Sequence, residues 1–248
     1  MSATIDPHSV AEQVARVRAR IRASGGTDVA LVAVTKGFGS DAVAAALRAG
    51  VADIGENYAQ EMLGKVDDAA GGVGSGTAPG DGHAAGAAPV RWHFLGRVQR
   101  NKVRALAPHV SLWQSVDRLE LGSEIARRAP GAAVLVQVNL SGQPQKGGCG
   151  WGELDELVDG LTTLELDVRG LMGVGPEGAA EDARSGFRRL VDAAERLGLP
   201  ERSIGMTADL EVAVEEGSTM VRVGRDLFGA RPLRSDRGGP DSEPSGTH

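Results

Sequence analysis

Residues 29–36 read Val-Ala-Leu-Val-Ala-Val-Thr-Lys, a short apolar run rich in β-branched residues that ends in a lysine. The run is too short for a typical helix, so it predicts a strand buried on both faces. A lysine at the carboxyl end of such a strand lies at the rim of a core, where desolvation favours the neutral amine. Lys36 is therefore a candidate for Schiff-base chemistry with an aldehyde; the simpler interpretation is a lysine whose chain reaches solvent from a strand end.

Seven further short apolar runs alternate with helical patterns along the chain. They cover residues 52–55, 91–95, 110–114, 133–138, 167–172, 202–205 and 220–223. Helices are predicted over residues 6–22, with Val10, Val14, Val17 and Ile21 on one face, and over 41–48, 118–128, 152–161, 180–197 and 209–216. Eight strands that alternate with helices predict a (β/α)8 barrel of the TIM type with an extra N-terminal helix. The competing doubly wound sheet is disfavoured because no G-x-G-x-x-G motif follows the first run.

Composition narrows the class of protein. The length of 248 residues fits one barrel domain, which we expect over residues 1–235. A formal charge of −6 disfavours binding to nucleic acid, which needs a basic face. Neither a membrane-spanning apolar stretch nor a secretory leader is seen, so we expect a cytoplasmic protein without membrane contact. The single cysteine and the scattered histidines predict no metal site.

Two segments are predicted to lie outside the barrel. Residues 67–89 are rich in Gly and Ala and have little to bury, so we expect a flexible, dispensable insertion. Residues 236–248 form a Gly/Pro/Ser tail that we expect to be disordered.

The candidate site follows from the ends of the predicted strands, because barrel enzymes carry their sites at the carboxyl ends. Lys36 and Asn57 follow the first and second strands. The last two strands end in Ile-Gly-Met206-Thr207 and in Val-Gly224-Arg225, where small residues let backbone N–H groups approach an anion. A strand-end lysine beside a phosphate cradle indicates a phosphorylated aldehyde, for which pyridoxal 5′-phosphate (PLP) is the obvious candidate.

Several ordered motifs carry a family resemblance. They are Leu31-Val-Ala-Val-Thr-Lys36, Ile54-Gly-Glu-Asn57, Trp92-His-Phe-Leu-Gly96, Gln137-Val-Asn-Leu-Ser-Gly142, Gly205-Met-Thr-Ala-Asp-Leu-Glu211 and Gly217-Ser-Thr-Met-Val-Arg-Val-Gly224. From about residue 6 to 232 the chain resembles the pyridoxal phosphate homeostasis proteins, single-domain relatives of the barrel domain of alanine racemase. The resemblance implies a barrel of the fold-type III class of PLP-binding proteins.

The resemblance also implies roles for individual residues. Lys36 matches the lysine that forms the internal aldimine, and Asn57 the asparagine that lines the ring. Arg222 matches the arginine near the pyridine nitrogen, which would keep that nitrogen unprotonated. The phosphate positions are matched by Met206, Thr207 and Gly224.

The implied function is to hold PLP as an internal aldimine and to take part in cellular PLP homeostasis, without catalytic turnover. Apo-PLP enzymes are the expected recipients of the cofactor, and we expect a monomer or a weak dimer.

The chain departs from the family pattern at two places near the site. Gly37-Phe-Gly-Ser40 replaces the usual Lys-Pro, so any role of that second lysine is lost or moved. Arg225 replaces a threonine. Its guanidinium has two options, to fold over the phosphate or to pair with Asp226 or another carboxylate, and we favour the first.

An amino-acid racemase is the rival function. Proton transfer on two faces of the cofactor needs two groups, and Tyr58 is the only tyrosine of the chain. Tyr58 follows Asn57 directly, whereas the racemase tyrosine comes from a separate domain of the partner subunit, so we favour the carrier. We interpret His93 as a strand residue with a satisfied hydrogen bond, and Glu56 either as an orienting group or as a member of a surface ion pair.

Overall fold

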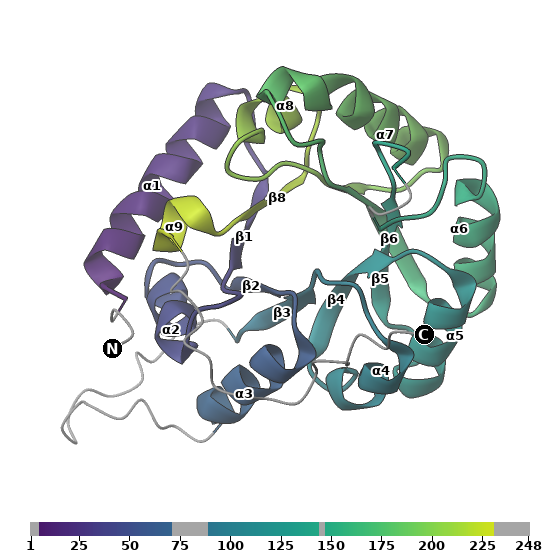
Figure 1. Cartoon of the computed structure of the whole chain (residues 1–248), viewed down its shortest axis with the longest axis horizontal. Helices are drawn as coiled ribbons and strands as arrows, with labels where there is room; N and C mark the ends of the chain where they lie inside the picture. Colours follow the sequence, from purple (N-terminus) through teal and green to yellow (C-terminus); the bar gives the residue numbers. More distant parts are fainter. Residues whose placement is uncertain (1–4, 71–88, 144–146, 231–248) are drawn as a thin grey trace, which may run out of the picture.

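Eight parallel strands form a closed barrel in the computed structural model, which describes residues 5–70, 89–143 and 147–230. The strands follow one another around the barrel in chain order, with the helices outside them (Figure 1). The predicted (β/α)8 barrel is therefore confirmed. The strands are β1 (Ala30–Val34), β2 (Asp53–Glu56), β3 (Arg91–Phe94), β4 (Val110–Val116), β5 (Ala133–Val138), β6 (Asp167–Gly173), β7 (Glu201–Ser203) and β8 (Met220–Val223).

The predicted helices are all present, except that η1 and α7 were predicted as one helix. No bounds were predicted for α3, α4 and α9. Helix α3 reaches Ala70, so the first residues of the expected insertion at 67–89 are helical; residues 71–88 and the tail at 236–248 lie outside the described part of the chain. The helices are α1 (Pro7–Ala23), α2 (Ser40–Arg48), α3 (Ala59–Ala70), α4 (Arg100–Leu106), α5 (Leu119–Arg128), α6 (Leu154–Thr163), the 3₁₀ turn η1 (Ala180–Ala183), α7 (Arg184–Arg196), α8 (Leu210–Glu215) and α9 (Arg225–Phe228).

Two apolar layers explain why the strands are buried on both faces. Leu31 and Ala33 of β1 pack outward against the helices, whereas Val32 between them belongs to a cluster inside the barrel. The alternation follows from the two-residue repeat of a strand. The interior cluster consists of Val32, Leu112, Ala133, Leu135, Met172 and Met220.

Helix α1 lies outside the barrel wall formed by β1 and β8, beside α2, α8 and α9 (Figure 1). Its N-cap is Asp6, whose carboxylate accepts from the N–H groups of His8 and Ser9. The four predicted apolar positions of α1, the first Val10 and the last Ile21, are all buried. Because α9 is only four residues long, α1 provides the apolar cover that a longer final helix would give to this wall.

Arg20 ties α1 to the loops that follow β7 and β8. Its Nε and Nη2 donate to the two carboxylate oxygens of Glu211 at 2.6 and 3.0 Å. Nη1 donates to Asp226 Oδ2 at 2.5 Å, and Nη2 also donates to the Thr207 carbonyl at 3.1 Å. The hydrogen bonds to Glu211 and Asp226 raise the pKa of Arg20 against the opposing effect of partial burial. One guanidinium thus holds the positions of α8, α9 and the Thr207 loop relative to α1.

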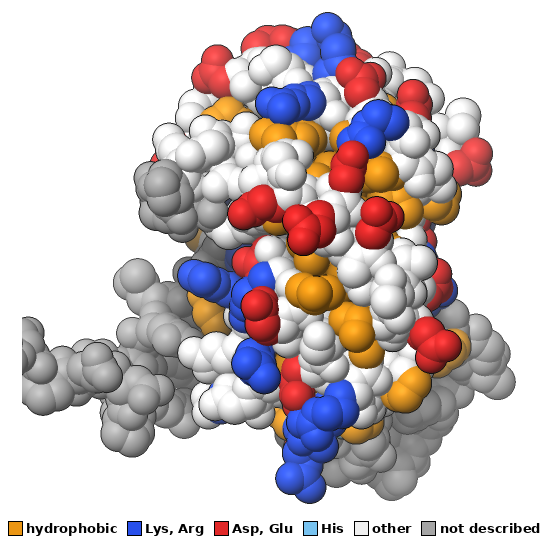
Figure 2. Space-filling model, turned by 90° about the vertical axis from the view of Figure 1, so that its right-hand side faces the viewer, with side chains coloured by type: hydrophobic (Ala, Val, Ile, Leu, Met, Phe, Trp, Pro, Cys, Tyr) orange, Lys and Arg blue, Asp and Glu red, His pale blue; other side chains and the backbone are white. Residues whose placement is uncertain are grey.

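The face of the molecule over α5, α6 and α7 mixes acidic and basic side chains (Figure 2). Arg196 of α7 pairs there with Asp155 of α6 at 2.7 Å. This face therefore offers no basic stripe of the kind that follows a nucleic-acid backbone. Over the part of the chain that the structure describes, no helix is long and apolar enough to cross a membrane.

Replacing Arg20 with glutamine should lower the free energy of unfolding by about 1–2 kcal/mol, because three elements lose a shared, partly shielded donor. The matched control is Arg16→Gln on the same helix. The Arg16 side chain is 69% exposed, and among the described residues its one ion pair is with Glu12, at 4.0 Å, so its loss should change the free energy by less than about 0.5 kcal/mol. Urea unfolding of the two variants measures the difference, and equal effects would show that Arg20 does not clamp the loops.

Candidate cofactor site

Three of the predicted site residues follow neighbouring strands at the mouth of the barrel. Val34 of β1 pairs with Gly55 of β2, so Lys36 and Asn57, each two residues further on, lie at the same level. A Cβ added to Gly224, directly after β8, would come within 2.9 Å of the Val34 carbonyl oxygen. Lys36, Asn57 and Gly224 thus follow the ends of β1, β2 and β8, respectively, as the sequence predicted. These three strands are neighbours in the barrel. Lys36 itself is half-buried.

Asn57 is held by close packing of the turn after β3. A Cβ on Gly96 would lie 2.0 Å from the Asn57 carbonyl oxygen, so only glycine fits at that position. The Ser115 hydroxyl donates to the Gly96 carbonyl at 2.5 Å and fixes the turn from the β4 side. The side-chain Oδ1 of Asn57 is buried and has no hydrogen-bond partner among the described residues. A buried acceptor without a donor is costly, which suits a position that contacts a ligand.

Arg222 lies inside the barrel, 5% exposed, with its guanidinium bound to neutral acceptors. Nη1 donates to both the carbonyl and the hydroxyl oxygen of Ser203 at 2.6 Å, and Nη2 donates to the Gly173 carbonyl at 2.8 Å. Within the described ranges no carboxylate forms an ion pair with it. Desolvation lowers the pKa of Arg222 to about 10, while Asp209 acts in the opposite direction. The group therefore stays cationic at neutral pH.

The loop after β7 is organised by Asp209, which is buried. Its Oδ1 accepts from the Met206 N–H at 2.6 Å, so this predicted phosphate donor is engaged within the loop. Gly205 has a φ of +95°, and a Cβ there would come within 2.6 Å of the Ala213 Cβ, which explains the glycine. Thr207 is half-buried, and its hydroxyl makes no hydrogen bond to any described residue.

Arg225 begins α9 and is exposed. Its neighbour Asp226 is paired with Arg20, so pairing of Arg225 with Asp226, one of the two options considered for it, is not formed. No other ion pair of Arg225 is seen among residues 5–70, 89–143 and 147–230. The rings of Phe38 and Phe228, 5.4 Å apart, connect the loop after Lys36 to the end of α9.

Sequence reasoning missed a buried charged cluster behind the site. Glu56 is fully buried, and its Oε1 accepts from Lys65 Nζ and, at 2.5 Å, from the Thr35 hydroxyl. Lys65, 5% exposed, also donates to the Thr35 carbonyl at 2.7 Å. Burial raises the pKa of Glu56, and Lys65 and Thr35 oppose that rise. The surface ion pair considered for Glu56 is therefore wrong. The sequence carried only a weak signal: Lys65 lies three residues after the apolar Met62 and so on the same face of α3.

Thr35 and Glu56 directly precede Lys36 and Asn57, so this cluster fixes the residue after β1 and the last residue of β2 from outside the barrel. Because side chains alternate along a strand, Thr35 and Glu56 face the helices and the next residues face the opposite side. The cluster joins both strand ends to α3.

His93 is 4% exposed, and both of its ring nitrogens have partners. Nε2 lies 3.0 Å from Asp53 Oδ1, and Nδ1 lies 2.7 Å from Gln114 Nε2. The interpretation as a satisfied strand histidine is confirmed. Desolvation raises the pKa of Asp53, but the hydrogen bonds from His93 and Arg91 outweigh it and lower the pKa to about 2.

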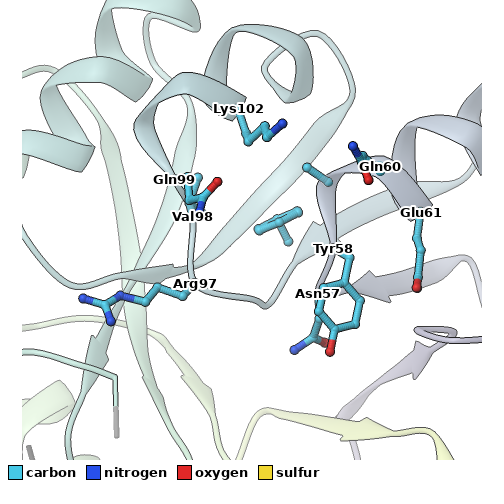
Figure 3. Close-up of a pocket in the computed structure, with 10 residues that line it drawn as sticks. Asn57, Tyr58, Gln60, Glu61, Arg97, Val98, Gln99 and Lys102 are labelled. Atoms are coloured by element: carbon cyan, nitrogen blue, oxygen red, sulfur yellow. The ribbon is translucent and has the colours of Figure 1, made fainter. Parts of the chain in front are cut away.

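A pocket of about 340 Å³ opens beside Asn57, between the start of α3 and the start of α4. In Figure 3, Lys102 and Gln99 on the α4 side face Tyr58 and Gln60 on the α3 side. Of the predicted cofactor contacts, Asn57 alone lines it. We therefore place the candidate cofactor site at the strand ends and regard this pocket as its neighbour.

Comparison with known proteins agrees with this geometry. The family described as "Alanine racemase, N-terminal domain" matches residues 5–232. A pyridoxal phosphate homeostasis protein of Pseudomonas aeruginosa is 39% identical over 249 residues, covering 94% of this chain and 99% of that protein. The protein of the same name from Escherichia coli K12 is 33% identical over 90% of this chain and 97% of its own length. The chain belongs to the pyridoxal phosphate homeostasis protein family.

Solved structures of relatives have the same fold. PipY of Synechococcus elongatus, solved with PLP bound, matches with a TM-score of 0.75 and 29% identity, over 89% of this chain and all of that one. Alanine racemase of Corynebacterium glutamicum matches with a TM-score of 0.66 and 15% identity, over 93% of this chain and 62% of the racemase. The racemase likeness shows the barrel fold alone.

Replacing Lys65 with methionine should lower the free energy of unfolding by about 3 kcal/mol or more, because Glu56 is left buried without its cation. The double variant Glu56→Gln with Lys65→Met removes both charges and should be more stable than Lys65→Met alone. Thermal and urea unfolding compare the two proteins. Equal stability of the single and double variants would show that the two charges are not coupled.

Proposed function

We propose that this protein binds PLP at the barrel mouth, with the aldehyde held covalently by Lys36, and acts in PLP homeostasis without turnover of its own. The observation that carries the proposal is that Lys36, Asn57 and Gly224 end three adjacent strands beside the buried cation Arg222. The naming of its relatives and the PLP-bound structure of PipY support the same cofactor.

The side chains present fit the cofactor at each end. Bound PLP supplies an aldehyde that combines with a neutral amine, and Lys36 is the strand-end lysine for it. The orphaned Asn57 Oδ1 would face the ring, and Arg222 would face the ring nitrogen. For the phosphate we assign Gly224, Thr207 and Arg225.

We keep Met206 among the proposed phosphate-binding residues, but its N–H is a weaker candidate donor to the phosphate because it already donates to Asp209. The first N–H groups of α9 have no partner within the helix, so Gly224 and Arg225 are better placed to donate.

Absence of turnover is the part of the proposal that rests on electrostatics. An arginine at the ring nitrogen disfavours a protonated ring, and an unprotonated ring is a weak electron sink for carbanion chemistry. The rival racemase needs a second acid/base group. Tyr58 is 50% exposed, lines the neighbouring pocket together with Asn57, and follows β2 of this same barrel, so it does not come from a separate domain.

Homeostasis without turnover implies a partner that receives the cofactor. We propose that apo-PLP enzymes are the recipients. Because such enzymes are made in the cytoplasm, we propose a cytoplasmic location, and we expect the protein to be a monomer or a weak dimer.

Borohydride reduction tests the cofactor assignment. After incubation with PLP and reduction, peptide mapping should place the pyridoxyl mass on the peptide that contains Lys36. The control Lys36→Ala should lose the visible absorption of bound PLP and keep the parent melting temperature, because the residue lies at a rim. A pyridoxyl mass found mainly on Lys102 or Lys146 would contradict the assignment.

Incubation with L-alanine tests turnover. The rate of racemisation should not exceed that of free PLP, because no second proton-transfer group is supplied at the strand ends. Chiral chromatography measures it, with Tyr58→Phe as the matched control. A saturable rate that Tyr58→Phe abolishes would establish the racemase function instead.

A further inference from the structure

A chain of hydrogen bonds crosses the barrel interior from Arg222 to Asp53. Arg222 Nη1 donates to the Ser203 hydroxyl at 2.6 Å, and that hydroxyl donates to Gln114 Oε1 at 2.7 Å. Gln114 Nε2 lies 2.7 Å from His93 Nδ1, and His93 Nε2 lies 3.0 Å from Asp53 Oδ1. The five side chains come from β8, β7, β4, β3 and β2, so the chain links strands on opposite sides of the barrel.

The two ends of this chain fix the direction of every bond in it. A guanidinium can only donate, and an ionised carboxylate can only accept. The Ser203 hydroxyl, which accepts from Arg222, therefore gives its single proton to Gln114. The amide nitrogen of Gln114 then donates to His93 Nδ1, so the ring proton is on Nε2 and points at Asp53. The geometry assigns His93 the neutral Nε2–H tautomer.

Burial makes the chain cooperative. Ser203 and Gln114 are fully buried, and His93 and Arg222 are 4% and 5% exposed. Water cannot replace a lost partner at such positions, so the loss of one hydrogen bond leaves the adjacent side chain with an unsatisfied donor or acceptor. The amide of Gln114 is additionally held by the Met220 sulfur, 3.1 Å from its Nε2.

We propose that Ser203, Gln114, His93 and Asp53 are positioning residues that fix the guanidinium of Arg222, and thereby set how the barrel holds the ring nitrogen of PLP. Three of the five N–H groups of Arg222 are used by Ser203 and Gly173, which leaves one on Nη2 and the Nε–H for the mouth. Only neutral groups accept hydrogen bonds from the guanidinium, and the carboxylate of Asp53 lies at the far end of the chain. Asp209 acts on Arg222 electrostatically but forms no ion pair with it among the described residues, so no carboxylate in direct contact neutralises the cation. The inference deepens the proposed function and rests on it.

The first test uses the protein without PLP. Nitrogen-15 NMR of labelled histidine should show His93 with a protonated Nε2 and an unprotonated Nδ1 at neutral pH, the signal being assigned by its loss in His93→Leu. Ser203→Ala lies two links from the ring and frees the amide of Gln114 to turn, so the Nδ1 signal should shift or split. Leu135→Met, an interior change without a hydrogen-bonding group, should leave it unchanged. A parent ring protonated on Nδ1, or a signal insensitive to Ser203→Ala, would overturn the directed chain.

The second test measures PLP itself. Ser203→Ala and Gln114→Met should each weaken PLP binding by about three- to tenfold and shift the absorption band of bound PLP, because Arg222 loses a fixed place at the ring. Leu135→Met should match the parent in both. Binding and spectrum unchanged in all variants would overturn the positioning role and leave PLP binding standing. No PLP binding by the parent would overturn the proposed function and the positioning role together, while the NMR result would still decide the donor chain.

Discussion

Closure of the barrel between β1 and β8 is the constraint on which the candidate site depends. Four consecutive residue pairs join the two strands, from Ala30 with Met220 to Ala33 with Val223. This register places Val32 beside Arg222, so the lysine after β1 and the arginine of β8 belong to neighbouring strands. A slip of one residue would turn one of these side chains to the outer face. Burial on both sides of β1 excludes such a slip, and Arg20 holds the loops after β7 and β8 from outside.

Two buried cations near this seam are stabilised in different ways. Lys65 has a carboxylate, Glu56, in direct contact, so the pair is close to neutral and fixes the ends of β1 and β2. Arg222 has carbonyl and hydroxyl oxygens instead: Asp209 acts on it electrostatically without an ion pair, and Asp53 is connected to it only through three neutral side chains. The first arrangement supports the backbone that carries Lys36. The second leaves a buried cation without a contacting carboxylate, which under the proposed function would face the electron-rich ring nitrogen of PLP.

The barrel could be predicted from the sequence because each strand is a local pattern, as in Val29–Val34, and because alternation with helices admits few topologies. The positions of Lys36, Asn57 and Gly224 followed from the same rule, since strand ends meet at one rim. The Arg20 clamp and the Glu56–Lys65 pair could not be predicted in this way. Their partners are far apart in sequence, and a charge on a helix is ordinarily solvated, so a burial that depends on tertiary packing leaves only a weak local signal.

Holding a cofactor and catalysing with it make opposite demands on the group at the ring nitrogen. A catalyst that stabilises a carbanion benefits from a proton on that nitrogen, whereas a fixed cation there favours the neutral ring. Under the proposed function, the hydrogen-bond chain from Arg222 to Asp53 favours the unprotonated ring nitrogen. The Arg222 guanidinium cannot accept a proton, and each hydrogen bond behind it has a fixed donor and a fixed acceptor. The barrel fold is shared with alanine racemase, so the fold does not decide between the two functions. Under the proposed function, the cation that Arg222 would place at the ring nitrogen is the feature of this protein that argues for holding PLP without turnover.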